Sequence, residues 1–136
     1  MKPAIKLELR IDWSEIDMLG HINNLAILKY VQSAKVNYLE KTLFTDVRQM
    51  KKIIPIVAAT SCQFVKQLYY PGKVCVHSFI EQIKTTSFIL KHEIYNEKEE
   101  IVAYAEDVMV LFDFEQNSKI PIPEEMKLML VNIEGK

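Results

Sequence analysis

The sequence predicts an α+β fold in which an antiparallel five-stranded sheet wraps around one long central helix. One segment, after residue 24, repeats apolar residues at helical spacing, whereas one segment before it and four after it have strand patterns. Strands joined by short connections pair antiparallel, and one apolar-faced helix needs one sheet face to cover it. With 136 residues, 49% of them hydrophobic, the chain is predicted to form a single domain over residues 1–136.

The first strand and the helix follow directly from two hydrophobic periods. Residues 5–13 alternate apolar and charged side chains without a break, which predicts a strand with one buried face. After the loop at residues 14–24, the period becomes helical for about five turns, with Asn23 or Asn24 as N-cap. The apolar positions of this helix are Ile27, Leu28, Val31, Ala34, Tyr38 and Leu39.

The rest of the chain is predicted to be four strands linked as hairpins. They are expected at residues 53–68, 74–83, 87–95 and 100–114. A Pro-Gly turn at 71–72 and polar turns at 84–86 and 96–99 separate them. The tail is expected to be extended at 120–123, with a short helix at 124–130.

Composition excludes several classes of function. The formal charge of −1 gives no basic excess for a nucleic-acid partner. No apolar run approaches the roughly 18 residues of a membrane span, and the first residues do not form a signal peptide. Cys62 and Cys75 are expected to be reduced thiols. A cytoplasmic protein is therefore predicted.

The predicted strands also indicate self-association. The strand at 87–95 keeps apolar residues on both faces, with Phe88 and Leu90 on one and Ile89 on the other. A single helix covers only one face, and an edge strand offers unpaired backbone groups. A homodimer or homotetramer is therefore expected.

The segment between the first strand and the helix is crowded with groups that can do chemistry. Asp17 precedes Gly20 by three residues. The helix that follows exposes its first N–H groups, which carry partial positive charge. An acyl carbonyl placed there would have its developing oxyanion stabilised. Asp17 is then a candidate nucleophile or general base on water, so the segment suits acyl transfer to water.

An ordinary structural role for the same residues stays open. Asp, Gly and Asn are common turn and cap residues between a strand and a helix. Gly20 indicates either a positive φ angle or the close approach of a ligand. His21 is expected to be hydrogen-bonded, and Asn24 to act as N-cap or to donate its backbone N–H to a substrate.

Other catalytic constellations are missing from the sequence. There is no Gly-x-Ser-x-Gly elbow, no Gly-rich phosphate loop and no dinucleotide fingerprint. His21, His77 and His92 do not pair at metal-ligand spacing. His77 and His92 fall on predicted strands, where a partly buried, hydrogen-bonded histidine is the expected role. Neither a metal nor another cofactor is predicted.

Residues 10–24 resemble the strand–loop–helix signature of the hotdog-fold acyl-CoA thioesterases of the 4-hydroxybenzoyl-CoA thioesterase type. In that family an Asp is followed by Gly-His-x-Asn-Asn, which matches Asp17 and residues 20–24 here. The likeness covers nearly the whole chain. It continues at residues 29–30, 34–35, 67–72, 86–88, 93–95 and 120–124.

The resemblance implies a hotdog fold, dimers with paired sheets that often form tetramers, and active sites at the dimer interface. The carboxylate of Asp17 would attack the thioester or activate water. The backbone N–H of Asn24 would polarise the thioester carbonyl. Gly20, His21 and Asn23 match the motif and would shape the site.

Further contacts follow from the same resemblance. Thr86 and Ser87, with neighbouring Thr85, would approach from the partner subunit or line the ligand channel. Ile27 stands where the family has a frequent Tyr, which makes the pocket more apolar and favours aliphatic over hydroxyaromatic acyl groups.

Three other positions depart from the family pattern. Glu15 replaces a common Asp, which leaves the charge intact. Gln32 and Lys35 replace a common Glu and Arg on the helix. Because a related subgroup uses a helix Glu for catalysis, Gln32 leaves Asp17 as the well-placed carboxylate.

The leading hypothesis is hydrolysis of acyl-CoA thioesters to a free carboxylic acid and CoA. An acyl-carrier-protein thioesterase is the first alternative, and a non-catalytic hotdog module that binds acyl thioesters is the second. CoA phosphates would need cations at the pocket mouth, for which Lys66, Lys73 and Lys84 are candidates by position.

Overall fold

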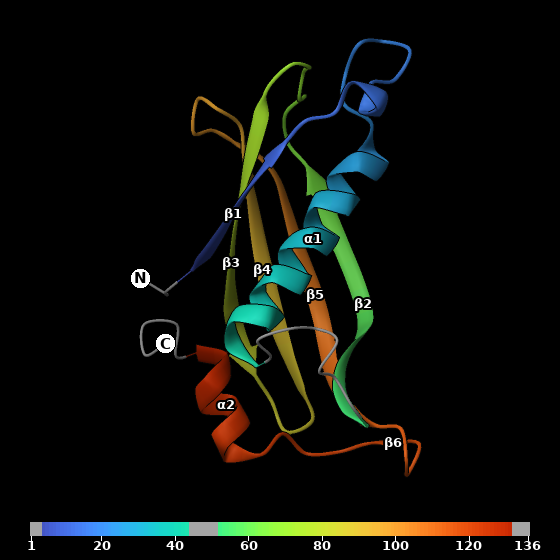
Figure 1. Ribbon diagram of the computed structural model, residues 1–136, viewed down its shortest axis with the longest axis vertical. Coiled ribbons are helices and arrows are strands. Elements are labelled where there is room, and N and C mark those ends of the chain that lie inside the picture. Colours follow the sequence, from blue (N-terminus) through green and yellow to red (C-terminus); the bar gives the residue numbers. More distant parts are fainter. Residues whose placement is uncertain (1–3, 44–51, 132–136) are drawn as a thin grey trace.

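The protein is described by a computed structural model that covers residues 4–43 and 52–131. One long helix lies across one face of a twisted antiparallel sheet (Figure 1). The predicted order of strand, long helix and four strands is confirmed, as is the short helix near the end. The elements are β1 (Ile5–Arg10), η1 (Trp13–Glu15), α1 (Asn24–Thr42), β2 (Ile53–Phe64), β3 (Lys73–Ile83), β4 (Ser87–Tyr95), β5 (Ile101–Asp113), β6 (Ser118–Lys119) and α2 (Glu124–Val131).

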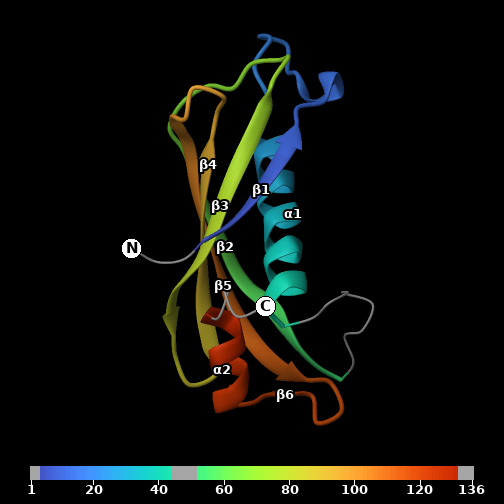
Figure 2. The same ribbon diagram turned by 60° about the vertical axis from the view of Figure 1, so that its left-hand side comes forward.

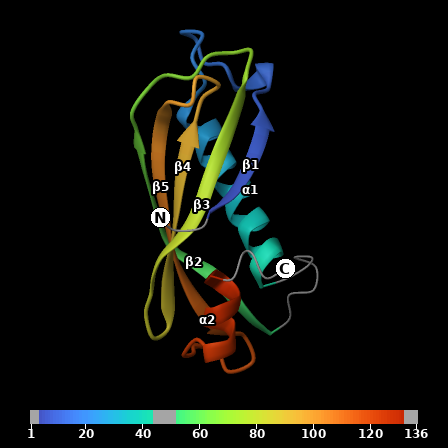
Figure 3. The ribbon, with the colours of Figure 1, turned by 90° about the vertical axis from the view of Figure 1, so that its left-hand side faces the viewer.

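The order of the strands differs from the predicted run of four strands linked as hairpins. The sheet runs β1-β3-β4-β5-β2, with every neighbouring pair antiparallel. β2 therefore pairs with β5 at one edge, and the segment 65–72 crosses the end of the sheet to reach β3 (Figure 3). The expected hairpin between these two strands is wrong because the crossing segment pairs with the loop before α1 instead, where Leu68 O accepts from Ile22 N at 2.9 Å.

The first strand is shorter than its alternating pattern predicts. β1 ends at Arg10, and Asp12 then caps the single turn η1 by accepting from Ser14 N at 3.0 Å. Trp13 is consequently 68% exposed instead of buried. A second unpredicted feature is the two-residue strand β6, which pairs with the end of β5.

Helix α1 covers the inner face of the sheet, and the outer face is open (Figure 2). Leu28 departs from the predicted buried stripe, because it is 37% exposed. The buried positions of α1 are Ala26, Ile27, Tyr30, Val31, Ala34, Tyr38 and Leu39. At the far end of α1 the Tyr38 hydroxyl donates to Leu130 O at 2.8 Å, so α2 closes that end of the core.

A row of polar side chains divides the core beneath α1 into two apolar clusters. Ser78 Oγ and His92 Nδ1 are hydrogen-bonded at 2.7 Å, and His92 Nε2 and Asp107 Oδ2 are hydrogen-bonded at 2.9 Å. Thr60 on β2 donates to Asp107 Oδ1 at 2.7 Å, which extends the row across four strands. The expectation of a buried, hydrogen-bonded histidine is confirmed for His92. One cluster lies on the Val76 side of this row and the other on the Ile80 side.

This row has the residue types of a hydrolytic Ser–His–Asp triad but not its setting. Ser78, His92 and Asp107 are each no more than 2% exposed, so a substrate does not reach the serine hydroxyl. The imidazole also presents Nδ1 to the serine, whereas a triad presents Nε2. The row is a structural element of the core.

The outer face of the sheet carries charged and half-buried side chains. Lys91 lies between Glu81 and Glu106, with Nζ to Oε2 distances of 3.8 and 3.7 Å. The His77 ring packs on Tyr95 with centroids 4.3 Å apart. Within the described ranges, no helix is long and apolar enough to span a membrane.

Candidate active site

Asp17 closes the loop that precedes α1. Its N–H donates to His21 O at 2.7 Å, and its Oδ1 accepts from the N–H groups of Leu19 and His21 at 2.9 and 3.0 Å. The side chain is exposed. Asp17 therefore has the ordinary structural role in a turn that the sequence left open. This role occupies one carboxylate oxygen, and Oδ2 accepts no hydrogen bond from the described part of the chain.

Gly20 adopts a positive φ angle of 83°. A Cβ atom added there would meet nothing within 4 Å. The sequence indicated either a positive φ angle or the close approach of a ligand at Gly20, and the structure has the positive φ angle. L-residues rarely adopt this φ, so glycine fits the loop for a conformational reason.

Asn23, and not Asn24, is the N-cap of α1. Its Oδ1 accepts from Ala26 N at 2.8 Å, and its own N–H donates to Glu15 O at 2.9 Å. The next two amides, those of Asn24 and Leu25, have no acceptor among the residues that the structure describes. They are the first N–H groups of the helix, where the helix dipole places partial positive charge. A carbonyl oxygen is a suitable acceptor for them.

His21 is fixed by its backbone and by its ring. It forms an isolated bridge with Tyr69, and its ring meets the Tyr69 ring edge-on at a centroid distance of 5.2 Å. The side-chain hydrogen bond expected for His21 is replaced by this aromatic contact. His21 thus joins the loop to the crossing segment 65–72.

A cavity of about 120 Å³ opens beside the start of α1. Asn24 lies at this cavity, and Ile27 forms part of its inner wall. Ile27 is 3% exposed and contributes an apolar side chain to this wall. The remaining lining comes from Ile22 and the segment Phe64, Val65, Lys66, Gln67 and Leu68.

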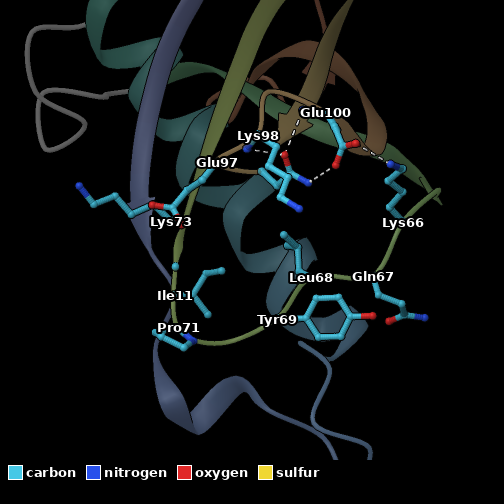
Figure 4. Close-up of a pocket in the computed structure, with 12 residues that line it drawn as sticks. Ile11, Lys66, Gln67, Leu68, Tyr69, Pro71, Lys73, Glu97, Lys98 and Glu100 are labelled. Carbon is cyan, nitrogen blue, oxygen red and sulfur yellow. Dashed lines mark hydrogen bonds and ion pairs between the residues drawn. The ribbon is translucent and has the colours of Figure 1, made fainter.

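A larger groove of about 460 Å³ lies on the other side of the crossing segment (Figure 4). It shares Lys66, Gln67 and Leu68 with the small cavity, but neither Asp17 nor Asn24 lines it. Lys66 there pairs with Glu100 at 2.9 Å, and Lys73 borders the same groove. Lys84 lines neither space.

The structure does not bring Thr86 and Ser87 to Asp17 within one chain. They lie at the hairpin between β3 and β4, at the opposite end of the sheet from the loop before α1 (Figure 1). Thr86 O accepts from Leu111 N at 3.0 Å there. Any role of these two residues at the site requires a second chain.

Glu15 belongs to the site, although the sequence analysis did not predict a site role for it. It is 9% exposed, and its Oε1 accepts from the Tyr30 hydroxyl at 2.6 Å and from Asp12 N at 3.0 Å. Burial, together with this hydrogen bond, raises the pKa of Tyr30 well above the usual tyrosine range. The signal was present, since Asp12 and Glu15 have the spacing of a capping box, and the structure contains that box.

The donor set of the described residues offers no metal centre. No group of three or more His, Cys, Asp or Glu side chains in the ranges 4–43 and 52–131 is arranged to hold an ion. Cys62 and Cys75 are free, and burial raises the pKa of both thiols.

The family of the chain follows from its match to a known family model. The model of the thioesterase-like superfamily matches residues 11–130, which include the loop, α1 and the whole sheet after it. The chain belongs to the thioesterase-like superfamily. Among curated relatives of this thioesterase-like protein is the uncharacterized protein YsmA of Bacillus subtilis (strain 168), 22% identical over 125 residues, with 92% of this chain and 84% of YsmA covered.

Solved structures show that the fold is the hotdog fold of thioesterases. The DHNA-CoA thioesterase of Staphylococcus aureus superposes with a TM-score of 0.80 at 24% identity, covering 98% of this chain and 95% of that one. A 4-hydroxybenzoyl CoA thioesterase variant complexed with 4-hydroxybenzoyl CoA gives a TM-score of 0.83 at 18% identity, covering 93% and 98%. The predicted fold and the predicted family are both confirmed.

Proposed function

We propose that this thioesterase-like protein hydrolyses acyl-CoA thioesters to a carboxylic acid and free CoA. The thioester carbonyl binds at the start of α1, where the unpaired N–H of Asn24, with that of Leu25 beside it, donates to the developing oxyanion. Water supplies the hydroxyl group, the carbon–sulfur bond breaks, and the CoA sulfur leaves as the thiol. This pair of free amides beside a carboxylate-bearing loop is the observation that carries the proposal.

Asp17 is the proposed catalytic carboxylate. Its loop bonds use Oδ1 alone, which leaves Oδ2 for the reaction. That oxygen either attacks the thioester carbon directly or takes a proton from the attacking water. Gly20, His21 and Asn23 hold the carboxylate and the helix start in place through the loop contacts described above.

The acyl group is proposed to be aliphatic. Ile27 and Ile22 line the cavity beside Asn24 with apolar carbon and bring no hydroxyl group. These two isoleucines favour contact with the methylene groups of an acyl chain, whereas Asn24, Lys66 and Gln67 supply the polar part of the lining. The substrate class therefore follows from the residue that departs from the family pattern.

A homodimer or a larger homo-oligomer is proposed to complete the site. β2 is an edge strand of 12 residues that carries no charged side chain, and its central residues are exposed. Such an edge is suited to pairing with the same strand of a second chain. Antiparallel pairing brings the end of one sheet that holds Thr86 and Ser87 toward the loop of the other chain. The free cysteines support a cytoplasmic location for this assembly.

The test is thiol release from a panel of acyl-CoA and acyl-carrier-protein thioesters, with wild type and Asp17→Asn. Because an amide Oδ1 still accepts from Leu19 and His21, the substitution preserves the loop while it removes the charge. We expect kcat to fall by about 100-fold or more with the fold unchanged. Glu8→Gln, an exposed carboxylate on β1, is the control and should hydrolyse as the wild type does.

Each result of this panel has a definite meaning. Undiminished hydrolysis by Asp17→Asn rejects the role of Asp17. Hydrolysis confined to carrier-protein thioesters rejects the CoA substrate and favours an acyl-carrier-protein thioesterase. Binding of acyl-CoA without thiol release across the panel rejects catalysis in favour of a binding module.

A further inference from the structure

We propose that Glu15 is a positioning residue for the thioesterase site, holding the loop of Asp17 at a fixed place against the first turns of α1. The inference rests on the proposed function and adds to it a second carboxylate with a different task. It is carried by the contacts of Glu15, which connect the loop to α1 through both side chain and backbone.

The side chain of Glu15 joins two elements. Its Oε1 accepts from the Tyr30 hydroxyl on α1 and from the backbone N–H of Asp12 at the start of η1. Oε2 faces the Lys29 ammonium at 3.7 Å, also on α1. The Tyr30 hydroxyl contact is short at 2.6 Å, in the range of a charge-assisted hydrogen bond.

The backbone of Glu15 adds a second connection. Its carbonyl accepts from both the N–H and the Nδ2 of Asn23, at 2.9 and 3.1 Å. Asn23 is the N-cap that sets the direction of the free amides of Asn24 and Leu25. Glu15 therefore contacts the cap of α1 with its backbone and the second turn of α1 with its side chain.

This double connection determines where Asp17 lies relative to the oxyanion site. Asp17 follows Glu15 by two residues, in a loop whose side chains from 16 to 20 are exposed. Hydrogen bonds rather than buried packing therefore hold that loop, and those of Glu15 are the ones that join it to α1. A displacement of about 1 Å between a catalytic group and its substrate costs roughly 100-fold in rate, so a fixed Glu15 is worth a large factor in kcat.

Glu15 itself does not take part in the chemistry. It is buried, it does not line the cavity beside Asn24, and Oε1 already accepts two hydrogen bonds. Its positioning role rests mainly on where its acceptor oxygen lies, and its charge adds strength to the hydrogen bond from Tyr30. A glutamine at this position keeps an oxygen for the Tyr30 hydroxyl and for Asp12 N.

The experiment compares kcat and KM for Glu15→Ala, Glu15→Gln and Tyr30→Phe. We expect Glu15→Ala to lower kcat by roughly 10- to 100-fold while KM changes less than about threefold. Glu15→Gln should stay within about threefold of wild type, and Tyr30→Phe, which removes only the hydroxyl, should lose about 3- to 10-fold in kcat. Tyr30→Phe also serves if the alanine variant does not fold.

The matched controls come from another Tyr–Glu pair. Tyr95 donates to Glu93 Oε1 at 2.9 Å on the outer face of the sheet, the face that α1 does not cover. Glu93→Ala and Tyr95→Phe remove the same type of hydrogen bond there and should leave kcat unchanged. The inference fails if these controls lose as much kcat, if Glu15→Ala keeps the wild-type kcat, or if Glu15→Gln is as impaired as Glu15→Ala.

Amide hydrogen exchange separates this inference from the proposed function. Glu15→Ala should accelerate exchange at the N–H groups of Asp17 and Asn23 about 10-fold or more relative to Glu93→Ala. A wild-type protein that hydrolyses no thioester rejects the proposed function, and exchange then decides the role of Glu15 alone. Unchanged exchange at both amides rejects the positioning role whatever the activity.

Discussion

His92 Nε2 lies 2.9 Å from Asp107 Oδ2 in the polar row between the two apolar clusters of the core. Both side chains are almost completely buried. The second polar atom of each is also hydrogen-bonded, His92 Nδ1 to Ser78 and Asp107 Oδ1 to Thr60. Such a pair is stabilising only while it is complete, because removal of one partner leaves a buried polar group without compensation.

We expect Asp107→Ala to lower the free energy of unfolding by about 3–5 kcal/mol. The adjacent Glu106→Ala is the control, since Glu106 lies half-exposed on the outer face and pairs with Lys91 at 3.7 Å, which is worth at most about 1 kcal/mol. Urea denaturation measures both. Equal losses for the two variants would contradict the structural role assigned to the polar row.

Gly20→Ala is expected to destabilise the protein by about 1–2 kcal/mol, because an L-residue at φ 83° is strained even though the space around it is open. Gly72→Ala is the matched control. Its added Cβ would lie 3.2 Å from Glu97 Oε1, the mobile end of an exposed side chain, so the neighbour moves at little cost. The midpoints of denaturant unfolding measure both variants. A larger loss of stability in Gly72→Ala than in Gly20→Ala would refute the conformational explanation.

Alkaline pH is expected to destabilise the fold through Tyr38. Burial raises the pKa of Tyr38 to about 12, from about 10 in the unfolded chain. The stabilisation is complete below pH 10 and is lost as pH rises toward 12, because only the unfolded state releases the proton in that window. The slope is about 1.4 kcal/mol for each pH unit. Tyr38→Phe should show a slope shallower by that amount between pH 10 and 12, and an unchanged slope would contradict the assignment.

The proposed pairing of β2 predicts the effect of a charge on that edge. Ala58 is exposed at the bulge in β2, and a lysine there would place two like charges at a paired edge. We expect the wild type to sediment as a dimer or larger, and Ala58→Lys to shift it toward monomer with loss of thioesterase activity. Glu8→Lys on β1, the other edge of the sheet, should keep the wild-type assembly. A monomeric wild type would reject the dimer.

Local patterns predicted most of the fold. The helical period at residues 24–42 and the turn at Pro71 and Gly72 each depend on neighbours along the chain, and those elements are present. The position of β2 next to β5 was not predicted, because hydrophobic period gives the face of a strand but not its neighbour. The early end of β1 was missed because the pattern through Trp13 continues past the cap at Asp12.

In the candidate site, too, the features that depend on local sequence were predicted and the contacts between distant residues were not. Asn23 as N-cap and a glycine with positive φ were among the predicted alternatives, because both depend on the local sequence. The contact between Glu15 and Tyr30 joins the loop to the second turn of α1, so no local pattern indicates it. From the sequence, Glu15 is interpreted only as a substitution that preserves charge. Catalysis by Asp17 stays a prediction, as does the approach of Thr86 and Ser87 from a second chain.

The crossing segment 65–72 has a consequence for the order of unfolding. Besides the Glu15 contacts with α1, the loop of Asp17 is held by the hydrogen bond from Ile22 N to Leu68 O and by the bridge of His21 with Tyr69. These two contacts join residues far apart in sequence. Contacts of this range form late in folding, and exposed loops open at lower free energy than central strands. On gradual heating, thioesterase activity should therefore disappear at a lower temperature than the circular dichroism signal of the sheet.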